Sequence, residues 1–112
     1  MKRLTLKKIV FTGNNNTIQY KYELTPDIKK YFNVKSPYYA KYDQDISKTP
    51  KSIAVIPFLA NIMPLAWFVG FDVYIDEVDT TFFSSLEKLK NQFIKFYPDK
   101  EIKGTLHVKT KV

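Results

Sequence analysis

The stretch IPFLANIMPLAWFVG, residues 56–70, decides how the rest of the chain folds. It lies inside a run of nineteen uncharged residues, 53–71, which reaches the bare length of a transmembrane helix. Pro57 and Pro64 fall within this run, and each proline removes a backbone hydrogen-bond donor. The other predicted elements also need an apolar partner to pack on. We therefore predict a buried helix over about residues 57–69 and expect no membrane span.

The ends and the faces of this helix follow from its residue types. Pro57 suits the first helical position, Pro64 should kink the helix or start a second one, and Gly70 should end it. Apolar residues surround the axis, so we expect burial on more than one face, by this domain's sheet, another domain or another subunit. Asn61 is the polar exception, on the same stripe as Pro57, Pro64 and Phe68. It could satisfy backbone groups freed by Pro64, or hydrogen-bond a ligand at a break in the helix.

The composition describes one globular domain. Of its 112 residues, 45% are hydrophobic and 26% charged, which is enough for a core without disulfides and too apolar for a disordered segment. With no cysteine, the chain offers no thiolate nucleophile and no Cys-containing zinc site, and we expect a cytoplasmic protein. Lys7 and Lys8 interrupt the N-terminal apolar segment, so we expect no signal peptide.

The net charge of +7 is compatible with a nucleic-acid, lipid or acidic protein partner. Lys, Asn, Ile, Phe and Tyr all have AT-rich codons, so a low-GC genome explains the excess of lysine equally simply. The segments QYKYEL and YYAKYD place aromatic residues beside cations, as single-stranded nucleic-acid platforms do. Tyr20 and Tyr22, however, share the face of Ile18 and Leu24, which we predict to be core. A small basic nucleic-acid-binding protein therefore remains the alternative function.

Alternation of apolar residues predicts the N-terminal half. Residues 4–11 form a strand whose phase changes across Lys7 and Lys8, which indicates a bulge. A Gly-Asn turn and a second strand over residues 17–24 complete a β-hairpin. Thr25 should cap a short helix that the Ser36-Pro37 pair breaks, and residues 38–43 predict a third strand before a polar loop.

The C-terminal half has the clearest helix. Residues 71–76 alternate as a strand, and residues 102–109 predict the last strand. Between them, Asp79 is a plausible N-cap for a helix over about residues 80–97, which Pro98 ends. Its apolar residues recur on one face, at Phe82, Leu86, Leu89, Phe93 and Phe96. Together these elements predict a single α+β domain, residues 1–112, in which two main helices pack on a small, mostly antiparallel sheet of about four to five strands.

Candidate chemistry is sparse. Asp72, Asp76, Glu77 and Asp79 carry oxygen ligands that suit Mg²⁺ or Ca²⁺, but they lack the spacing of an EF-hand loop, so we expect no metal. His107 is predicted on a strand surface, without a serine or cysteine arrangement that would make it a catalytic base. The three glycines are scattered, so no phosphate-binding loop is present. We therefore expect no catalytic residue, no cofactor and no activity from this chain alone.

One segment resembles a known family. The chain matches a pattern P-x-L-x-N-x-x-P-x-x-x-x-x-G-x-D, followed by an F-Y-x-S-L-like helix, a YPD end and a KG strand. The matching positions are Pro57, Leu59, Asn61, Pro64, Gly70, Asp72, residues 82–86, residues 97–99 and Lys103-Gly104. This pattern is similar to the N-terminal region of a bacterial family with the nucleotide-alpha-hydrolase fold (PP-loop ATPases), distantly related to 7-cyano-7-deazaguanine synthase and to the muropeptide epimerase that uses ATP.

The resemblance implies an accessory role. Several members of that family lie in cell-surface polysaccharide gene clusters, and their ATP-handling Ser-Gly-Gly-x-Asp element is downstream of the matched region. This chain does not contain that element, so no catalytic residue carries over. The resemblance implies the N-terminal part of a longer ATP-dependent enzyme, which would help form its substrate site or pack against its ATPase domain. We expect contact with another protein domain, or a homo-oligomer, through the apolar helix, at Pro57, Asn61, Pro64, Trp67 and Asp72.

Overall fold

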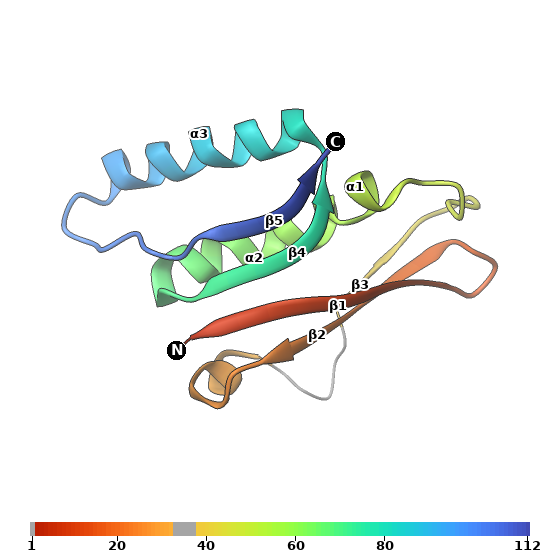
Figure 1. Ribbon diagram of the computed structural model, residues 1–112, viewed down its shortest axis with the longest axis horizontal. Helices are drawn as coiled ribbons and strands as arrows, with labels where there is room; N and C mark the ends of the chain where they lie inside the picture. Colours follow the sequence, from red (N-terminus) through yellow and green to blue (C-terminus); the bar gives the residue numbers. More distant parts are fainter. Residues whose placement is uncertain (1, 33–37) are drawn as a thin grey trace.

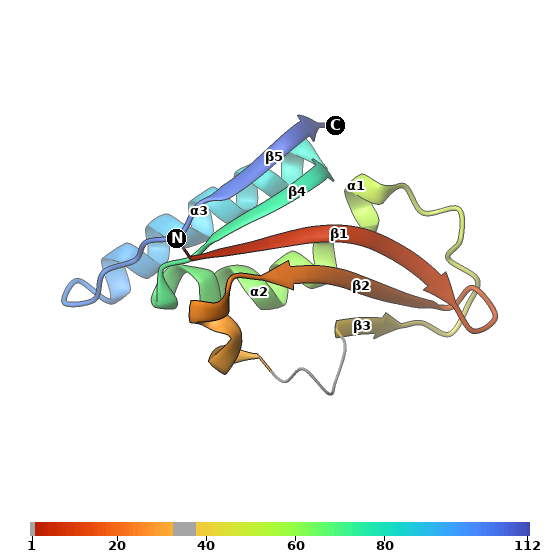
Figure 2. The ribbon, with the colours of Figure 1, turned by 60° about the horizontal axis from the view of Figure 1, so that its bottom comes forward.

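The protein consists of a sheet with helices on one face (Figures 1 and 2). The computed structural model describes residues 2–32 and 38–112, so the predicted break at Ser36-Pro37 lies outside the described residues. The five strands lie in the order β3-β2-β1-β4-β5. Seen in Figure 2, α2 and α3 lie behind the sheet, and none of the described helices lies on the opposite face. The α+β class predicted from the sequence is confirmed.

The N-terminal hairpin forms as its alternation predicts. Strand β1 (Arg3–Thr12) pairs antiparallel with β2 (Thr17–Leu24), and their register shifts between Leu6 and Lys8. The predicted bulge is therefore present. Strand β3 (Tyr38–Lys41) pairs antiparallel with β2 and forms one edge of the sheet.

A short 3-10 helix, η1 (Pro26–Tyr31), follows the hairpin. Thr25 precedes it as expected, but its side chain makes no capping hydrogen bond. The Thr25 hydroxyl instead accepts a hydrogen bond from the Arg3 backbone N–H, at 2.9 Å, and donates one to Asp27, at 2.6 Å. The side chain therefore ties the end of the hairpin to the start of β1.

The opening stretch is helical. A short helix α1 (Lys51–Ala54) leads through Val55 into α2 (Ile56–Val69), with Pro57 in its first turn. Pro64 lies inside α2, and the helix continues past it to Val69. Gly70 adopts a left-handed conformation, with φ of 88°, and its N–H donates to the Ala66 carbonyl at 2.8 Å. The predicted glycine C-cap is confirmed.

A β-α-β unit completes the domain. Strand β4 (Asp72–Val78) leads into α3 (Thr80–Phe96), and the chain returns as β5 (Leu106–Lys111) parallel to β4. Asp79 caps α3 as predicted, because its carboxylate accepts a hydrogen bond from the Phe82 N–H at 2.9 Å. The last strand begins later than predicted. Gly104 has a positive φ of 71°, and the Lys103 N–H is bonded to the Trp67 carbonyl instead of to a strand.

The prediction of a mostly antiparallel sheet was wrong, because the sheet is mixed. Strands β1 and β4 are parallel, as are β4 and β5, whereas β1–β2 and β2–β3 are antiparallel. A helix between two strands carries the chain back across the sheet, so the next strand starts at the same end as the last. Helix α3 makes β5 parallel to β4 in this way.

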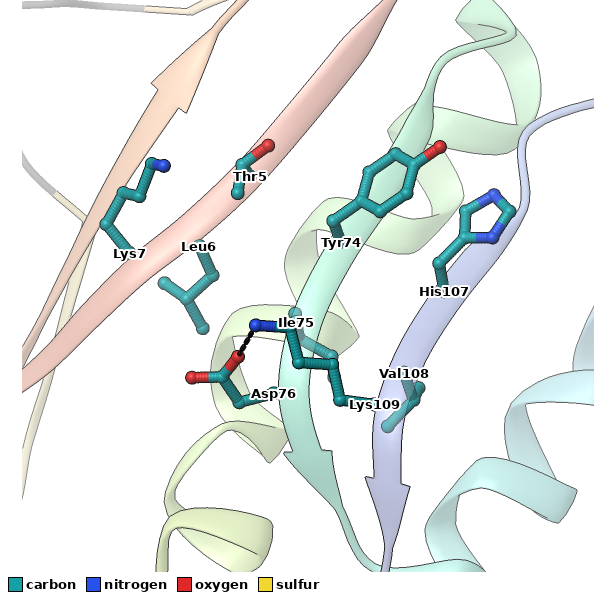
Figure 3. A pocket seen from close by; sticks show the side chains of 9 residues that line it. All are labelled: Thr5, Leu6, Lys7, Tyr74, Ile75, Asp76, His107, Val108 and Lys109. Carbon is teal, nitrogen blue, oxygen red and sulfur yellow. Dashed lines mark ion pairs between the residues drawn. The ribbon is translucent and has the colours of Figure 1, made fainter.

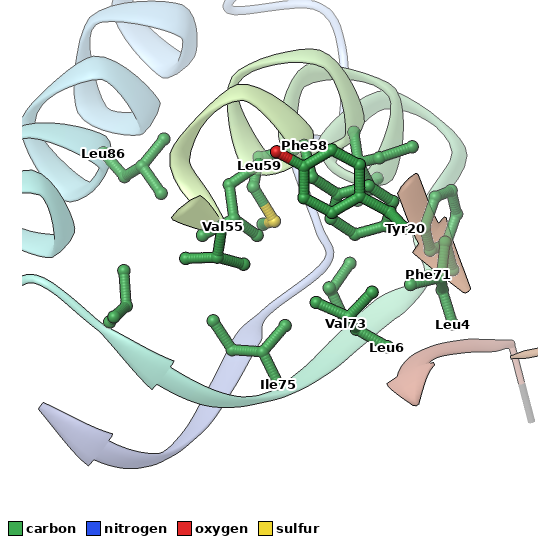
Figure 4. Close-up of a cluster of buried hydrophobic side chains, with 14 of the residues drawn as sticks. Leu4, Leu6, Tyr20, Val55, Phe58, Leu59, Phe71, Val73, Ile75 and Leu86 are labelled. Carbon is green, nitrogen blue, oxygen red and sulfur yellow. The ribbon is translucent and has the colours of Figure 1, made fainter. Parts of the chain in front are cut away.

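The core lies between the sheet and α2 (Figure 4). Phe58, Leu59 and Ile62 of α2 are fully buried against inward residues of the central strands. Inward side chains come from β1, β2 and β4, and include Leu4, Ile18, Tyr20, Val73 and Ile75. Among residues 2–32 and 38–112, no helix has both the length and the apolar character that crossing a membrane requires.

Candidate interaction surface

Helix α2 presents part of the predicted contact region to solvent. Its outer stripe consists of Pro57, Asn61, Pro64 and Phe68, of which Asn61 and Phe68 are exposed. The Asn61 side-chain amide donates to the Pro57 carbonyl at 2.8 Å, four residues back in the same helix. This bond differs from the first of the two roles predicted for Asn61. The acceptor is the Pro57 carbonyl and not that of Ala60, which loses its usual donor because Pro64 has no N–H.

Trp67 points in the opposite direction. Only 2% of its surface is exposed, and its ring meets Phe93 of α3 edge to face, with centroids 5.3 Å apart. The indole therefore joins α2 to α3 inside the core. A partner could reach it only if the two helices separated.

Asp72 lies on the helix-free face of the sheet. One carboxylate oxygen accepts a hydrogen bond from the Thr105 N–H at 3.0 Å, and the other is 3.1 Å from Nε2 of His107. The first contact joins β4 to the residue that precedes β5, and the second joins β4 to β5 itself. The five predicted site residues thus do not form one site: three are on the outer stripe, Trp67 is in the core, and Asp72 is across the sheet.

An aromatic surface on the helical layer was not anticipated from the sequence. We call Phe68, Phe93, Phe96 and Tyr97 the helical-layer patch. The Phe68 ring lies 5.8 Å from that of Phe93 and 5.4 Å from that of Tyr97, centroid to centroid. Phe96 has 71% of its surface exposed and Phe68 has 45%. Phe96 is exposed because the C-terminal end of α3 extends beyond the start of β5 and has no strand beneath it (Figure 1).

The helix-free face carries polar and charged side chains. His107 lies on this surface, as predicted, and its ring stacks on Tyr74 with centroids 4.4 Å apart (Figure 3). The Arg3 guanidinium lies 5.6 Å from the centre of the same tyrosine ring. Cross-strand contacts of this kind order the side chains of β1, β4 and β5.

The acidic residues around β4 make separate local interactions and do not converge on one point. Asp76 pairs with Lys109 of β5 at 3.3 Å, Asp72 holds His107 and the Thr105 N–H, and Asp79 caps α3. Within the part of the chain that the structure describes, no group of three or more such side chains could hold a metal ion.

Comparisons with family models, with curated proteins and with solved structures find no match to this chain. Function therefore has to be inferred from two surfaces of the protein. One is an aromatic patch on the helical layer, and the other is a charged, helix-free face of the sheet.

Proposed function

We propose that this chain is a non-catalytic interaction domain that docks onto another protein domain through the helical-layer patch. The observation that carries the proposal is the exposed ring of Phe68 in contact with Phe93 and Tyr97, together with the exposed Phe96 at the same end of α3. Burying apolar surface contributes about 25 cal/mol per Å², and aromatic side chains supply large areas of it. A contiguous exposed apolar patch is typical of a contact region.

The resemblance noted in the sequence supplies the class of partner. It would make this chain the N-terminal accessory domain of an ATP-dependent enzyme of cell-surface carbohydrate biosynthesis, with a PP-loop ATPase domain as the partner. Several residues of the matched pattern help to shape the fold, which supports this proposal. Pro57 and Pro64 are in α2, Gly70 ends α2, and Gly104 lies against the end of α2. A pattern of fold-determining residues fits a scaffold domain whose catalysis is elsewhere.

The chemistry on the surface agrees with a non-catalytic role. His107 is hydrogen-bonded to a carboxylate and stacked on a tyrosine. Among the described residues, it makes no hydrogen bond to a serine or threonine hydroxyl that it could activate as a nucleophile.

The alternative of nucleic-acid binding loses the tyrosines of QYKYEL as stacking surfaces, whereas Tyr39 and Tyr42 of the second segment are exposed. Tyr20 is 3% exposed, and its ring stacks on Phe58 with centroids 5.1 Å apart. The Tyr22 ring lies 5.9 Å from that of Phe32 and 5.7 Å from that of Phe58. A base has no access to the Tyr20 ring, and the Tyr22 ring is already in aromatic contact.

The test measures association with a PP-loop ATPase domain from the source organism, purified as a separate chain. Isothermal titration calorimetry should detect binding, and sedimentation velocity of this chain alone should report any self-association. Phe96→Asp should weaken whichever association occurs by at least about tenfold, because a charge would be desolvated in the contact. Tyr39→Asp is the matched control, since Tyr39 is an aromatic residue that is 64% exposed on β3.

Two results would contradict the proposal. One is the absence of both self-association and binding to the ATPase domain. The other is binding that Phe96→Asp and Tyr39→Asp weaken equally.

A further inference from the structure

The sheet splits between its two central parallel strands. The β1–β4 ladder consists of Arg3–Asp72, Leu4–Val73 and Thr5–Tyr74, and it ends there. The β1 bulge comes immediately afterwards, between Leu6 and Lys8. A bulge bends its strand and increases the local twist, which accounts for the divergence of β1 from β4. Figure 2 shows the two strands separating toward their C-terminal ends.

Beyond the Thr5–Tyr74 pair, β4 has no strand partner on its β1 side among the described residues. The Asp72 N–H bonds to Lys2 on the β1 side, whereas the Val73 N–H bonds to Thr105 on the β5 side. Backbone groups alternate along a strand, so the Asp76 N–H also faces β1, beyond the last pair of the ladder. A hydrogen-bond donor is therefore available inside the split.

Two adjoining hollows occupy the split and together form one cleft. The first has a volume of about 320 Å³ and opens on the helix-free face (Figure 3), and the second has a volume of about 300 Å³. They share Leu6, Lys7, Ile75 and Asp76. Apolar side chains line both hollows, namely Leu6, Ile9, Val55, Ile75 and Val108. The cleft can thus accept an apolar group.

The charged side chains around the cleft favour an anion. They comprise four lysines and two carboxylates, a net charge of +2: Lys7, Lys8, Lys51, Lys109, Asp76 and Glu77. Asp76 is already paired with Lys109. Lys7 has only a long contact with Glu23, at 3.7 Å, and Lys8 and Lys51 make no ion pair in residues 2–32 and 38–112. At least two cations at the cleft are therefore free to bind a ligand.

We propose that this cleft binds a small molecule that carries a phosphate or carboxylate group on an apolar ring or chain. The apolar part lies on Leu6 and Ile9 of β1, and the anionic group meets Lys8 and Lys51. None of Phe68, Phe93, Phe96 and Tyr97 lines either hollow, so the site is separate from the docking patch.

The test is an amide NMR titration of the intact chain with phenyl phosphate, benzoate and uncharged benzyl alcohol. We expect saturable shifts centred on Lys7, Lys8, Lys51 and Asp76 with the anions, and markedly weaker binding of the alcohol. The stronger of the two anions identifies the group that the site prefers. Each lysine should contribute about fivefold to affinity, so Lys8→Ala combined with Lys51→Ala should weaken binding by about twentyfold.

The control variant is Lys41→Ala combined with Lys95→Ala, which removes the same amount of positive charge at positions outside the cleft. Both lysines are exposed, on β3 and α3 respectively. Equal weakening by the two double variants would show that only the overall charge matters and would overturn the site. Shifts scattered over the surface, or equal binding of benzyl alcohol, would also overturn it. A single-stranded oligonucleotide that binds across β2 and β3 more tightly than either small anion would assign this face to nucleic acid instead.

Discussion

The hydroxyl of Tyr20 on β2 donates a hydrogen bond of 2.5 Å to the Ala54 carbonyl at the end of α1. This bond crosses the core from the sheet to the helical layer, and both residues are buried. Tyr20→Phe keeps the ring stacked on Phe58 but leaves the carbonyl without this donor. We expect a loss of about 1 kcal/mol in the free energy of unfolding, measured by urea denaturation.

Tyr39→Phe is the control for that measurement. The Tyr39 hydroxyl makes no hydrogen bond in the part of the chain that the structure describes, and its ring is exposed. Its loss should change the unfolding free energy by less than about 0.5 kcal/mol. Equal losses in the two variants would show that the Tyr20 bond contributes nothing.

Tyr20 should also make stability depend on pH at the alkaline end. Burial raises the pKa of Tyr20 above its ordinary value, with a smaller contribution from Tyr42. A group whose pKa is higher in the folded state stabilises the protein fully below its unfolded pKa, which is about 10 for tyrosine. The stabilisation is then lost as the pH rises further. The difference in unfolding free energy between wild type and Tyr20→Phe should therefore shrink above about pH 10. A difference that stays constant to higher pH would contradict this.

Local patterns predicted local structure well. The change of phase at Lys7 and Lys8 indicated the bulge, and Asp79 and Gly70 were correctly identified as helix caps. Each of these features depends on residues within one or two turns of each other. Strand direction does not, because it depends on which edge of the hairpin β4 joins. The parallel β1–β4 pair was therefore missed.

The surfaces were harder to predict than the elements. The periodic face of α3 indicated core along its whole length, yet Phe96 is exposed because the sheet does not reach it. Trp67 and Asp72 are five residues apart in sequence but lie on different sides of the sheet. The cleft needs a bulge in β1 and lysines from β1 itself, from α1 and from β5. A single sequence shows these residues but does not show that the fold brings them together.

Gly104 should tolerate substitution much less well than Gly70. Both have a positive φ, but a Cβ on Gly104 would lie 2.5 Å from the Ala66 carbonyl oxygen and 2.7 Å from that of Phe71. A Cβ on Gly70 would meet only the Lys103 side chain, at 3.7 Å. We expect Gly70→Ala to cost about 1 kcal/mol from left-handed strain alone, and Gly104→Ala about 3 kcal/mol because backbone must also move. Similar unfolding free energies for the two variants would show that the segment does not pack on the end of α2.

Two leucines of α3 test whether the outer part of this helix is uncovered in solution. Leu86 and Leu89 belong to the same predicted apolar face, but Leu86 is 7% exposed and Leu89 is 42% exposed. Leu86→Ala should leave a cavity beside Trp67 and Phe83 and cost about 3 kcal/mol of unfolding free energy. Leu89→Ala should cost less than about 1 kcal/mol, since much of the side chain already contacts water. The helix propensity changes equally in both variants, so the difference reports burial alone. If Leu89→Ala is as costly as Leu86→Ala, and its cost grows with protein concentration, a second copy covers α3 and self-association is the natural use of the helical layer. If the cost is equally large at every concentration, the uncovered face described for α3 is wrong.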